Sequence, residues 1–151
     1  MKDIYSQKIL EALQEDARMT VQQISERVGL STTPCWKRIK EMEAQGIITG
    51  YTVRVDRKKV GLNLMVLAEI NVTQHTDKAL AEFIAAVQAT PQIVHCYSTT
   101  GTADFVLTVL VQDIDVYEHF LMQTLFKLPA VSHVRSSFVL RDLKQGMGLP
   151  L

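Results

Sequence analysis

Residues 20–46 combine a glycine, a proline and an apolar repeat in an order that fits two short helices joined by a tight turn. Gly29 can take the positive φ that ends a helix without strain, and Pro34 is tolerated only in the first turn of a helix. After the proline, apolar residues recur at i, i+4 and i+7, the spacing of one helical face: Cys35, Ile39 and Met42. The pattern predicts a helix, a turn and a second helix that ends at Gly46.

Residues on either side extend this unit. Thr20 is followed three positions later by Gln23, which is the spacing of a capping box. A further helix is expected over residues 6–15, with Ser6 as its N-cap. Apolar residues flank a glycine-containing turn over residues 47–55, which indicates a short hairpin or wing. We therefore expect three short helices around a small core, followed by a wing.

The second helix of this unit would turn apolar residues inward and cations outward, as a helix that enters the DNA major groove does. The candidates for DNA contact are Ser31, Thr32, Thr33, Trp36, Lys37, Arg38 and Lys40. The hydroxyl groups could cap the helix or contact phosphate, and Trp36 could stack in the groove or pack against the domain. Singly, each cation is as easily a solvated surface charge. Together on one helix they favour phosphate contact.

The net charge of zero argues only weakly against a nucleic-acid partner, because the charge is unevenly distributed. Residues 1–60 hold eleven Lys and Arg against eight Asp and Glu, so the remaining residues carry the balancing negative charge. A basic first part and an acidic second part suit a protein whose first domain meets phosphate. The excess is small, so a monomer should bind DNA weakly.

Composition narrows the other possibilities. No apolar run of signal-peptide or membrane-spanning type occurs in the sequence. Cys35 and Cys96 lie far apart, which is typical of reduced, buried cysteines in a cytosolic protein. Zinc-binding spacing is not found among the histidines, which are His75, His95, His119 and His133. Catalytic elbows and glycine-rich phosphate loops are also lacking, so we predict no metal, no cofactor and no enzyme activity.

The second half follows a different pattern. Strands are expected over 62–73, 93–99, 104–111 and 131–140, and amphipathic helices over 76–89 and 113–128. The order β-α-β-β-α-β is the ferredoxin-like plan, in which both helices cover one face of an antiparallel sheet. Residues 105–111 are apolar at nearly every position, whereas a sheet with one wet face should alternate. The other face must therefore be covered, most simply by a second subunit.

Both halves of the chain carry a resemblance to a known family. Residues 24–31, 38–40 and 43–51 resemble the helix-turn-helix of the Lrp/AsnC (feast/famine) transcriptional regulators, and Gly101-Thr-Ala-Asp104 resembles the G-x-x-D turn of their second domain. The resemblance implies an α+β protein with an N-terminal winged helix-turn-helix domain and a ferredoxin-like βαββαβ (RAM-type) domain. It also implies a cytoplasmic, nucleoid-associated regulator that binds double-stranded DNA and assembles into dimers and often octamers.

The same resemblance implies an amino-acid effector, of leucine or methionine type, near the G-x-x-D turn. The expected site residues are Thr100, Gly101, Thr102 and Asp104. A carboxylate can hold the ligand's ammonium group, and loop amides can hold its carboxylate. Taken without the resemblance, the turn is also consistent with a tight loop in which Asp104 bonds to nearby backbone amides.

Two departures from the family stand out. Trp36 is bulky where the family more often has a small aliphatic residue, and Ser6 stands where an acidic cap is common. We expect a DNA-binding domain over residues 1–52, a linker over 53–60 and an effector-binding and oligomerisation domain over 61–151. A small metabolic enzyme or regulatory subunit, or a nucleoid-organising protein with little sequence preference, would be the alternatives.

Overall fold

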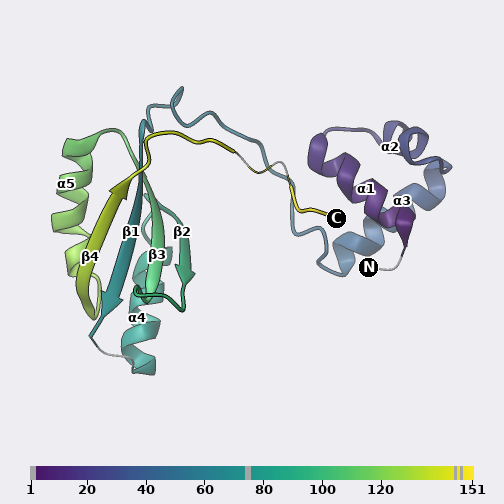
Figure 1. The fold of residues 1–151 in the computed structure, drawn as a ribbon. Coiled ribbons are helices and arrows are strands. Elements are labelled where there is room, and N and C mark those ends of the chain that lie inside the picture. The colour runs from purple at the N-terminus through teal and green to yellow at the C-terminus, as the bar shows by residue number, and fades with distance from the viewer. Residues whose placement is uncertain (1–2, 74–75, 145, 147) are drawn as a thin grey trace. The chain divides into compact units, whose positions relative to one another are not determined.

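The computed structural model of the chain describes residues 3–73, 76–144, 146 and 148–151. Two compact units form, one from residues 1–54 together with 143–151 and the other from residues 55–142 (Figure 1). The first unit is helical, and the second combines a sheet with helices. Among the described residues, no helix has the length and apolar character needed to span a membrane.

Three helices make up the first unit: α1 (Ile4–Glu15), α2 (Val21–Val28) and α3 (Thr32–Ala44). One apolar cluster holds them together, and its buried members are Ile9, Ala12, Ile24, Val28, Cys35, Ile39 and Met42. The inward face predicted for the second helix of the motif is therefore confirmed. With its back fixed in this way, α3 presents its remaining sides outward.

Local signals place the helix ends. Thr20 and Gln23 form the predicted capping box, with Gln23 N 3.2 Å from Thr20 Oγ1 and Thr20 N 2.8 Å from Gln23 Oε1. Gly29 ends α2 at φ 76°, in the left-handed region that favours glycine. The N-cap predicted for α1 is wrong: Asp3 caps the helix, and the Ser6 hydroxyl donates to its carboxylate at 2.9 Å. The acidic cap that appeared to be missing is thus present, three residues earlier.

The segment after α3 differs from expectation. Residues 47–55 contain no paired strand, so the predicted hairpin is not formed. Ile48 packs against the apolar cluster of the first unit, and the following residues run extended and exposed. The backbone N–H groups of Ile47 and Ile48 donate to the Met42 carbonyl at the end of α3 instead, and the described sheet consists of β1 to β4 without this segment.

The second unit is built on an antiparallel sheet in the order β2-β3-β1-β4. Its strands are β1 (Leu64–Val72), β2 (Ile93–Ser98), β3 (Phe105–Val111) and β4 (Val131–Phe138), and its helices are α4 (Asp77–Gln88) and α5 (Ile114–Gln123). Phe83 of α4 and Phe120 of α5 pack against the same sheet face. The predicted βαββαβ order is confirmed.

The helix predicted over residues 113–128 is shorter than expected. It ends at Gln123, because Thr124 leaves the helical region at φ −122° and ψ −64°. A short 3-10 turn follows over Leu125–Lys127. This turn brings Leu125 and Leu128 into the core. A continued α-helix would have placed the two side chains elsewhere.

The two faces of the sheet are now assigned. On β3, Leu107 and Val109 are both fully buried on the face covered by the helices. The outward positions are Val106, Thr108 and Leu110, because alternate residues of a strand face opposite ways. They pair across β1 with Glu69, Leu67 and Met65. This second face, which we call the outer face, is thus apolar at four of these six positions.

Residues from the far end of the chain group with the first unit. The side-chain amide of Gln14, on α1, donates to the Leu149 carbonyl and accepts from the Leu149 backbone N–H. Gly148 lies against the same side chain at φ +146°, where any other side chain would meet Gln14. The contact therefore depends on a glycine at this position.

Candidate DNA-binding and effector-binding sites

The exposed side of α3 gathers most of the predicted DNA contacts. Thr33, Lys37 and Lys40 are exposed and recur at i, i+4 and i+7, which places them on one stripe away from the core. Trp36 is 52% exposed beside this stripe, so it does not pack into the domain. Ser31 is the N-cap residue but makes no side-chain cap bond, and Thr32 is exposed. These hydroxyl groups are thus open to an external partner.

Arg38 is placed differently from the other two cations. Its Nε lies 2.7 Å from Asp3 Oδ2, and its Nη1 donates to the Pro34 carbonyl at 3.3 Å. The guanidinium also lies over the Tyr5 ring, 5.8 Å from its centroid. The hydrogen bond from Arg38 holds the pKa of the Asp3 carboxyl below its usual value. The structure thus turns Arg38 toward α1, where it ties two helices together.

The two remaining cations each have an acidic neighbour. Lys37 Nζ lies 3.9 Å from Glu41, whereas Lys40 Nζ lies 2.6 Å from Glu43. Glu43 also accepts from the Tyr51 hydroxyl at 2.9 Å. These two bonds, the one from Lys40 foremost, hold the pKa of Glu43 below its usual value. Sequence reasoning missed Glu43 and Tyr51, although the i, i+3 spacing of Lys40 and Glu43 was a readable signal.

The G-x-x-D turn is tied to the end of β1. Asp104 N donates to the Ile70 carbonyl at 3.0 Å, and Asp104 Oδ2 accepts from Val72 N at 2.9 Å. Asn71 donates its side-chain amide to the Thr102 carbonyl at 2.7 Å. The carboxylate is thus partly occupied by backbone, as the tight-loop interpretation expected. Asn71 and Val72 were not among the predicted residues, since strand pairing alone brings them there.

The rest of the turn is open. Thr100, Gly101 and Thr102 are exposed, and they lie with Asp104 in the turn that joins β2 to β3. Gly101 does not have a left-handed φ, and a Cβ built on it would meet nothing within 4 Å. The turn therefore does not require glycine for its own conformation. The space beside Gly101 is therefore open to a ligand or to another subunit.

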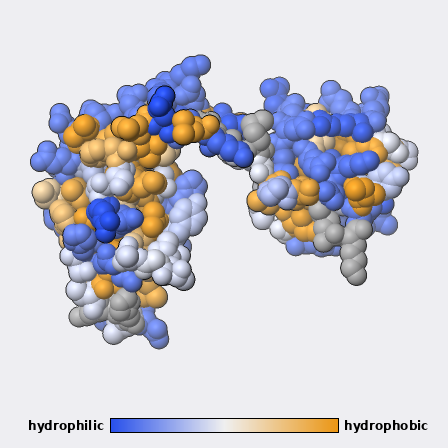
Figure 2. Space-filling view, viewed as in Figure 1, coloured by the Kyte–Doolittle hydropathy of each residue, from blue (hydrophilic) through white to orange (hydrophobic). Residues whose placement is uncertain are grey.

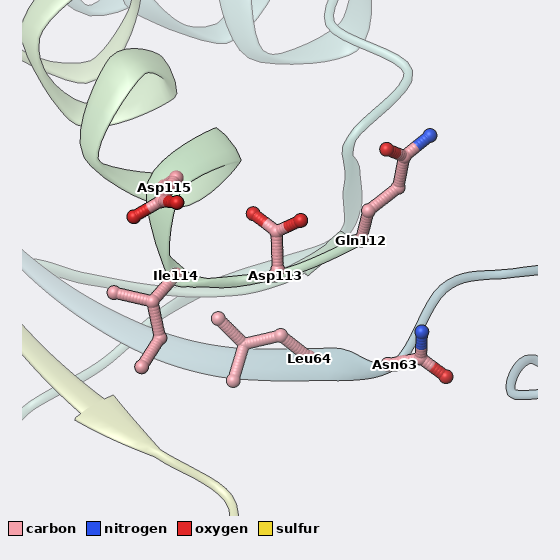
Figure 3. Close-up of a pocket in the computed structure, with 6 residues that line it drawn as sticks. All are labelled: Asn63, Leu64, Gln112, Asp113, Ile114 and Asp115. Atoms are coloured by element: carbon pink, nitrogen blue, oxygen red, sulfur yellow. The ribbon is translucent and has the colours of Figure 1, made fainter.

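A hollow elsewhere in this unit does not involve these residues. It is lined by Asn63, Leu64, Gln112, Asp113, Ile114 and Asp115 (Figure 3). Leu64 pairs with Val111 at one end of the β1–β3 ladder, whereas Ile70 and Phe105, beside the turn, pair at the other. Asp113 is already engaged as the N-cap of α5, accepting from Val116 N at 2.9 Å. The hollow and the G-x-x-D turn are separate features.

The described side chains also show what the protein offers for a metal site or a reactive thiol. Within residues 3–73, 76–144, 146 and 148–151, no group of three or more His, Cys, Asp or Glu is placed to hold a metal ion. Of the four histidines considered above, His75 lies outside the described residues. Cys35 and Cys96 are both free thiols. Cys35 is buried as expected, whereas the expected burial of Cys96 is wrong because that residue is exposed. Partial desolvation still raises the pKa of both thiols.

Comparison with known proteins bears on both sites. The sequence model of the winged helix-turn-helix DNA-binding family matches residues 2–49, and that of the Lrp/AsnC ligand binding domain matches residues 65–149. The chain is 37% identical over 143 residues to the proline dehydrogenase transcriptional activator of Rhizobium radiobacter, covering 95% of this chain and 92% of that one. It is 35% identical to the leucine-responsive regulatory protein of Escherichia coli K12, covering 95% and 87%.

The solved structures agree. A transcriptional regulator from Neisseria meningitidis in complex with L-methionine has a TM-score of 0.94 at 33% identity, covering 99% of this chain and 97% of that one. An AsnC family regulator from Agrobacterium tumefaciens has a TM-score of 0.93 at 35% identity, covering 98% and 96%. These relatives are transcriptional regulators rather than enzymes, and both family models together span the two units. The chain belongs to the Lrp/AsnC family of DNA-binding transcriptional regulators.

Proposed function

We propose that this regulator binds a free amino acid, of leucine or methionine type, at the turn formed by Thr100, Gly101, Thr102 and Asp104. The observation that carries the proposal is the open, polar turn within a domain of the Lrp/AsnC ligand-binding family. The relatives support the choice of ligand: one is named for its response to leucine, and another was solved with L-methionine.

The chemistry of the turn suits such a ligand. The Asp104 carboxylate is half-buried and engaged through Oδ2 with Val72 N, which leaves its other oxygen for an ammonium group. The exposed residues before it can offer backbone N–H groups to the ligand's carboxylate. Because the turn is open in a single subunit, a second copy would close the site around the ligand.

Self-association is the second part of the proposal. The outer face of the sheet carries apolar residues on its central strands: Met65, Leu67, Val106 and Leu110. In Figure 2, hydrophobic side chains lie over the sheet of this unit between hydrophilic ones. A second copy is the proposed cover, which gives a dimer with two DNA-binding domains, and dimers would assemble further into octamers. Such a regulator would act in the cytoplasm, in association with the nucleoid.

DNA contact is proposed for the exposed side of α3. Thr33, Lys37 and Lys40 would meet the major groove and its phosphates, with Ser31, Thr32 and Trp36 beside them. Arg38 would have to leave Asp3 to join them. The domains proposed for these roles are residues 1–52 for DNA binding and 61–151 for effector binding and assembly, joined by residues 53–60.

Calorimetry on the full chain with each of the twenty amino acids tests the effector proposal. An ammonium–carboxylate hydrogen bond is worth about 1.5–3 kcal/mol, so Asp104→Ala should weaken binding about ten- to hundredfold. Asp115→Ala is the matched control, because that exposed carboxylate lines the separate hollow of Figure 3. Equal heats for the parent and Asp104→Ala, or no heat with any amino acid, would show that the site assignment is wrong.

A further inference from the structure

Glu43 holds two partners with two separate oxygens. Its Oε2 accepts from Lys40 Nζ at 2.6 Å, and its Oε1 accepts from the Tyr51 hydroxyl at 2.9 Å. Lys40 comes from the same helix, whereas Tyr51 comes from the extended segment that follows α3. The carboxylate therefore joins the proposed recognition helix to the segment beyond it.

The position of Glu43 on α3 puts this carboxylate near DNA. It lies three residues after the exposed Lys40 and four after the buried Ile39, so it stands at the border between the two sides of α3, with its side chain 29% exposed. A carboxylate at such a place repels phosphate and competes with it for the Lys40 ammonium. Because the Lys40 side chain is 53% exposed, the pair is screened by solvent and opens readily.

Tyr51 determines what happens when the pair opens. If Lys40 moves to a phosphate, Glu43 keeps its second hydrogen bond, so the carboxylate stays in place instead of swinging away. The hydrogen bond from Lys40 is the largest cause of the lowered pKa of Glu43, and the one from Tyr51, which remains when Lys40 moves, lowers it as well. A fixed negative charge thus remains beside the groove whichever partner Lys40 takes.

We propose that Glu43 is a specificity-determining residue of the DNA interface, which masks Lys40 on unrelated DNA and positions its ammonium for the phosphate of a matching site. The proposal rests on α3 being the recognition helix. Non-specific binding is almost entirely electrostatic, so the Glu43 charge weakens it directly. Binding to a matching site loses less, because there Glu43 also orients Lys40 before contact.

The test measures two affinities of the full-length protein. Fluorescence anisotropy would follow binding to a duplex obtained by in vitro selection and to a scrambled duplex of the same length, each at several salt concentrations. Glu43→Gln should bind the scrambled duplex about three- to tenfold more tightly and the selected duplex by a smaller factor. The gain on the scrambled duplex should exceed the gain on the selected duplex by more than twofold, so the specificity ratio should fall more than twofold.

Three further variants separate this role from simpler ones. Glu41→Gln makes the same charge change on the same helix, but Glu41 lies 3.9 Å from Lys37, so both affinities should rise alike and the ratio should hold. Tyr51→Phe removes only the anchor to the following segment. In a Lys40→Ala background, Glu43→Gln should no longer change the ratio. Thermal unfolding of each variant checks that the fold is kept.

The proposal is overturned by any of three results. The ratio for Glu43→Gln could stay within twofold of the parent, or Glu41→Gln could lower it equally, which would make the effect one of general charge. Alternatively, Tyr51→Phe could reproduce the whole effect while Glu43→Gln still acts without Lys40. In that case Glu43 would serve only to anchor the extended segment.

Discussion

Lys37 and Arg38 are neighbours in the sequence, yet the structure gives them different surroundings. Lys37 is exposed on the side of α3 away from the core, whereas Arg38 is paired with Asp3 of the residues that begin α1. A sequence pattern that counts cations on one helix cannot separate them, because a rotation of one residue decides which neighbour is met. Arg38 thus takes part in helix packing, and we expect phosphate contact from Lys37.

Replacing Lys37 or Lys40 tests the first of these expectations. Each phosphate contact releases about one counterion, so Lys37→Ala or Lys40→Ala should weaken binding and lower the salt slope by about 0.9. Folding should hardly change, since both side chains are exposed. Lys8→Ala, an exposed lysine on α1, is the control and should leave the slope alone. An unchanged slope in both α3 variants would contradict the assigned face.

The Asp3–Arg38 pair gives a pH-dependent expectation. The bond from Arg38 lowers the pKa of Asp3 in the folded state, so the carboxyl stabilises the fold above its unfolded pKa of about 3.9. That stabilisation is lost as the pH falls through the lower folded value. Asp3→Asn should thus be less stable than the parent at pH 7, and the gap should close below pH 4. Urea unfolding of both proteins at pH 7 and pH 3 measures this gap.

Elements whose ends depend on local chemistry could be predicted from the sequence. The capping box of Thr20 and Gln23 and the left-handed Gly29 both use contacts within a few residues, so sequence spacing suffices. The prediction of a hairpin over residues 47–55 was wrong, because a strand needs a pairing partner and the residue pattern does not show whether one is present. The predicted end of α5 was wrong, because Leu125 packs into a core made of segments that are distant in the sequence.

The candidate sites were also predictable only where local spacing determines the geometry. The exposed stripe on α3 could be predicted because helical phase follows from residue spacing alone. The neighbours of Asp104 could not, since Ile70 and Val72 reach the turn only through the pairing of β1 with β3. The outward face of β3 could not be predicted either, because a strand that is apolar at nearly every position shows no alternation between apolar and polar residues.

A charge on each face of β3 tests the assignment of its two faces. Leu110→Glu places a carboxylate on the outer face, so it should convert an assembled protein to monomers while the fold is kept. Val109→Glu places it in a fully buried position, where an unpaired charge should unfold the unit. Light scattering with circular dichroism separates the two outcomes. An assembly unaffected by Leu110→Glu, or a parent chain that is monomeric at micromolar concentration, would contradict the proposed interface.

At the scale of the whole molecule, the chain divides recognition from response. The first unit carries the exposed cations of α3, and the second carries the open turn and the apolar outer face. We therefore expect an effector at the turn to change DNA binding through its different affinity for two states of the assembly.

The most direct test of this account is the affinity for DNA from upstream of the protein's own gene, measured with and without each amino acid. The account predicts binding that weakens steeply with salt and that at least one aliphatic amino acid shifts about fivefold or more. Asp104→Ala should keep the salt-dependent binding and lose the shift. DNA affinity that none of the twenty amino acids changes, or a shift that persists in Asp104→Ala, would contradict it.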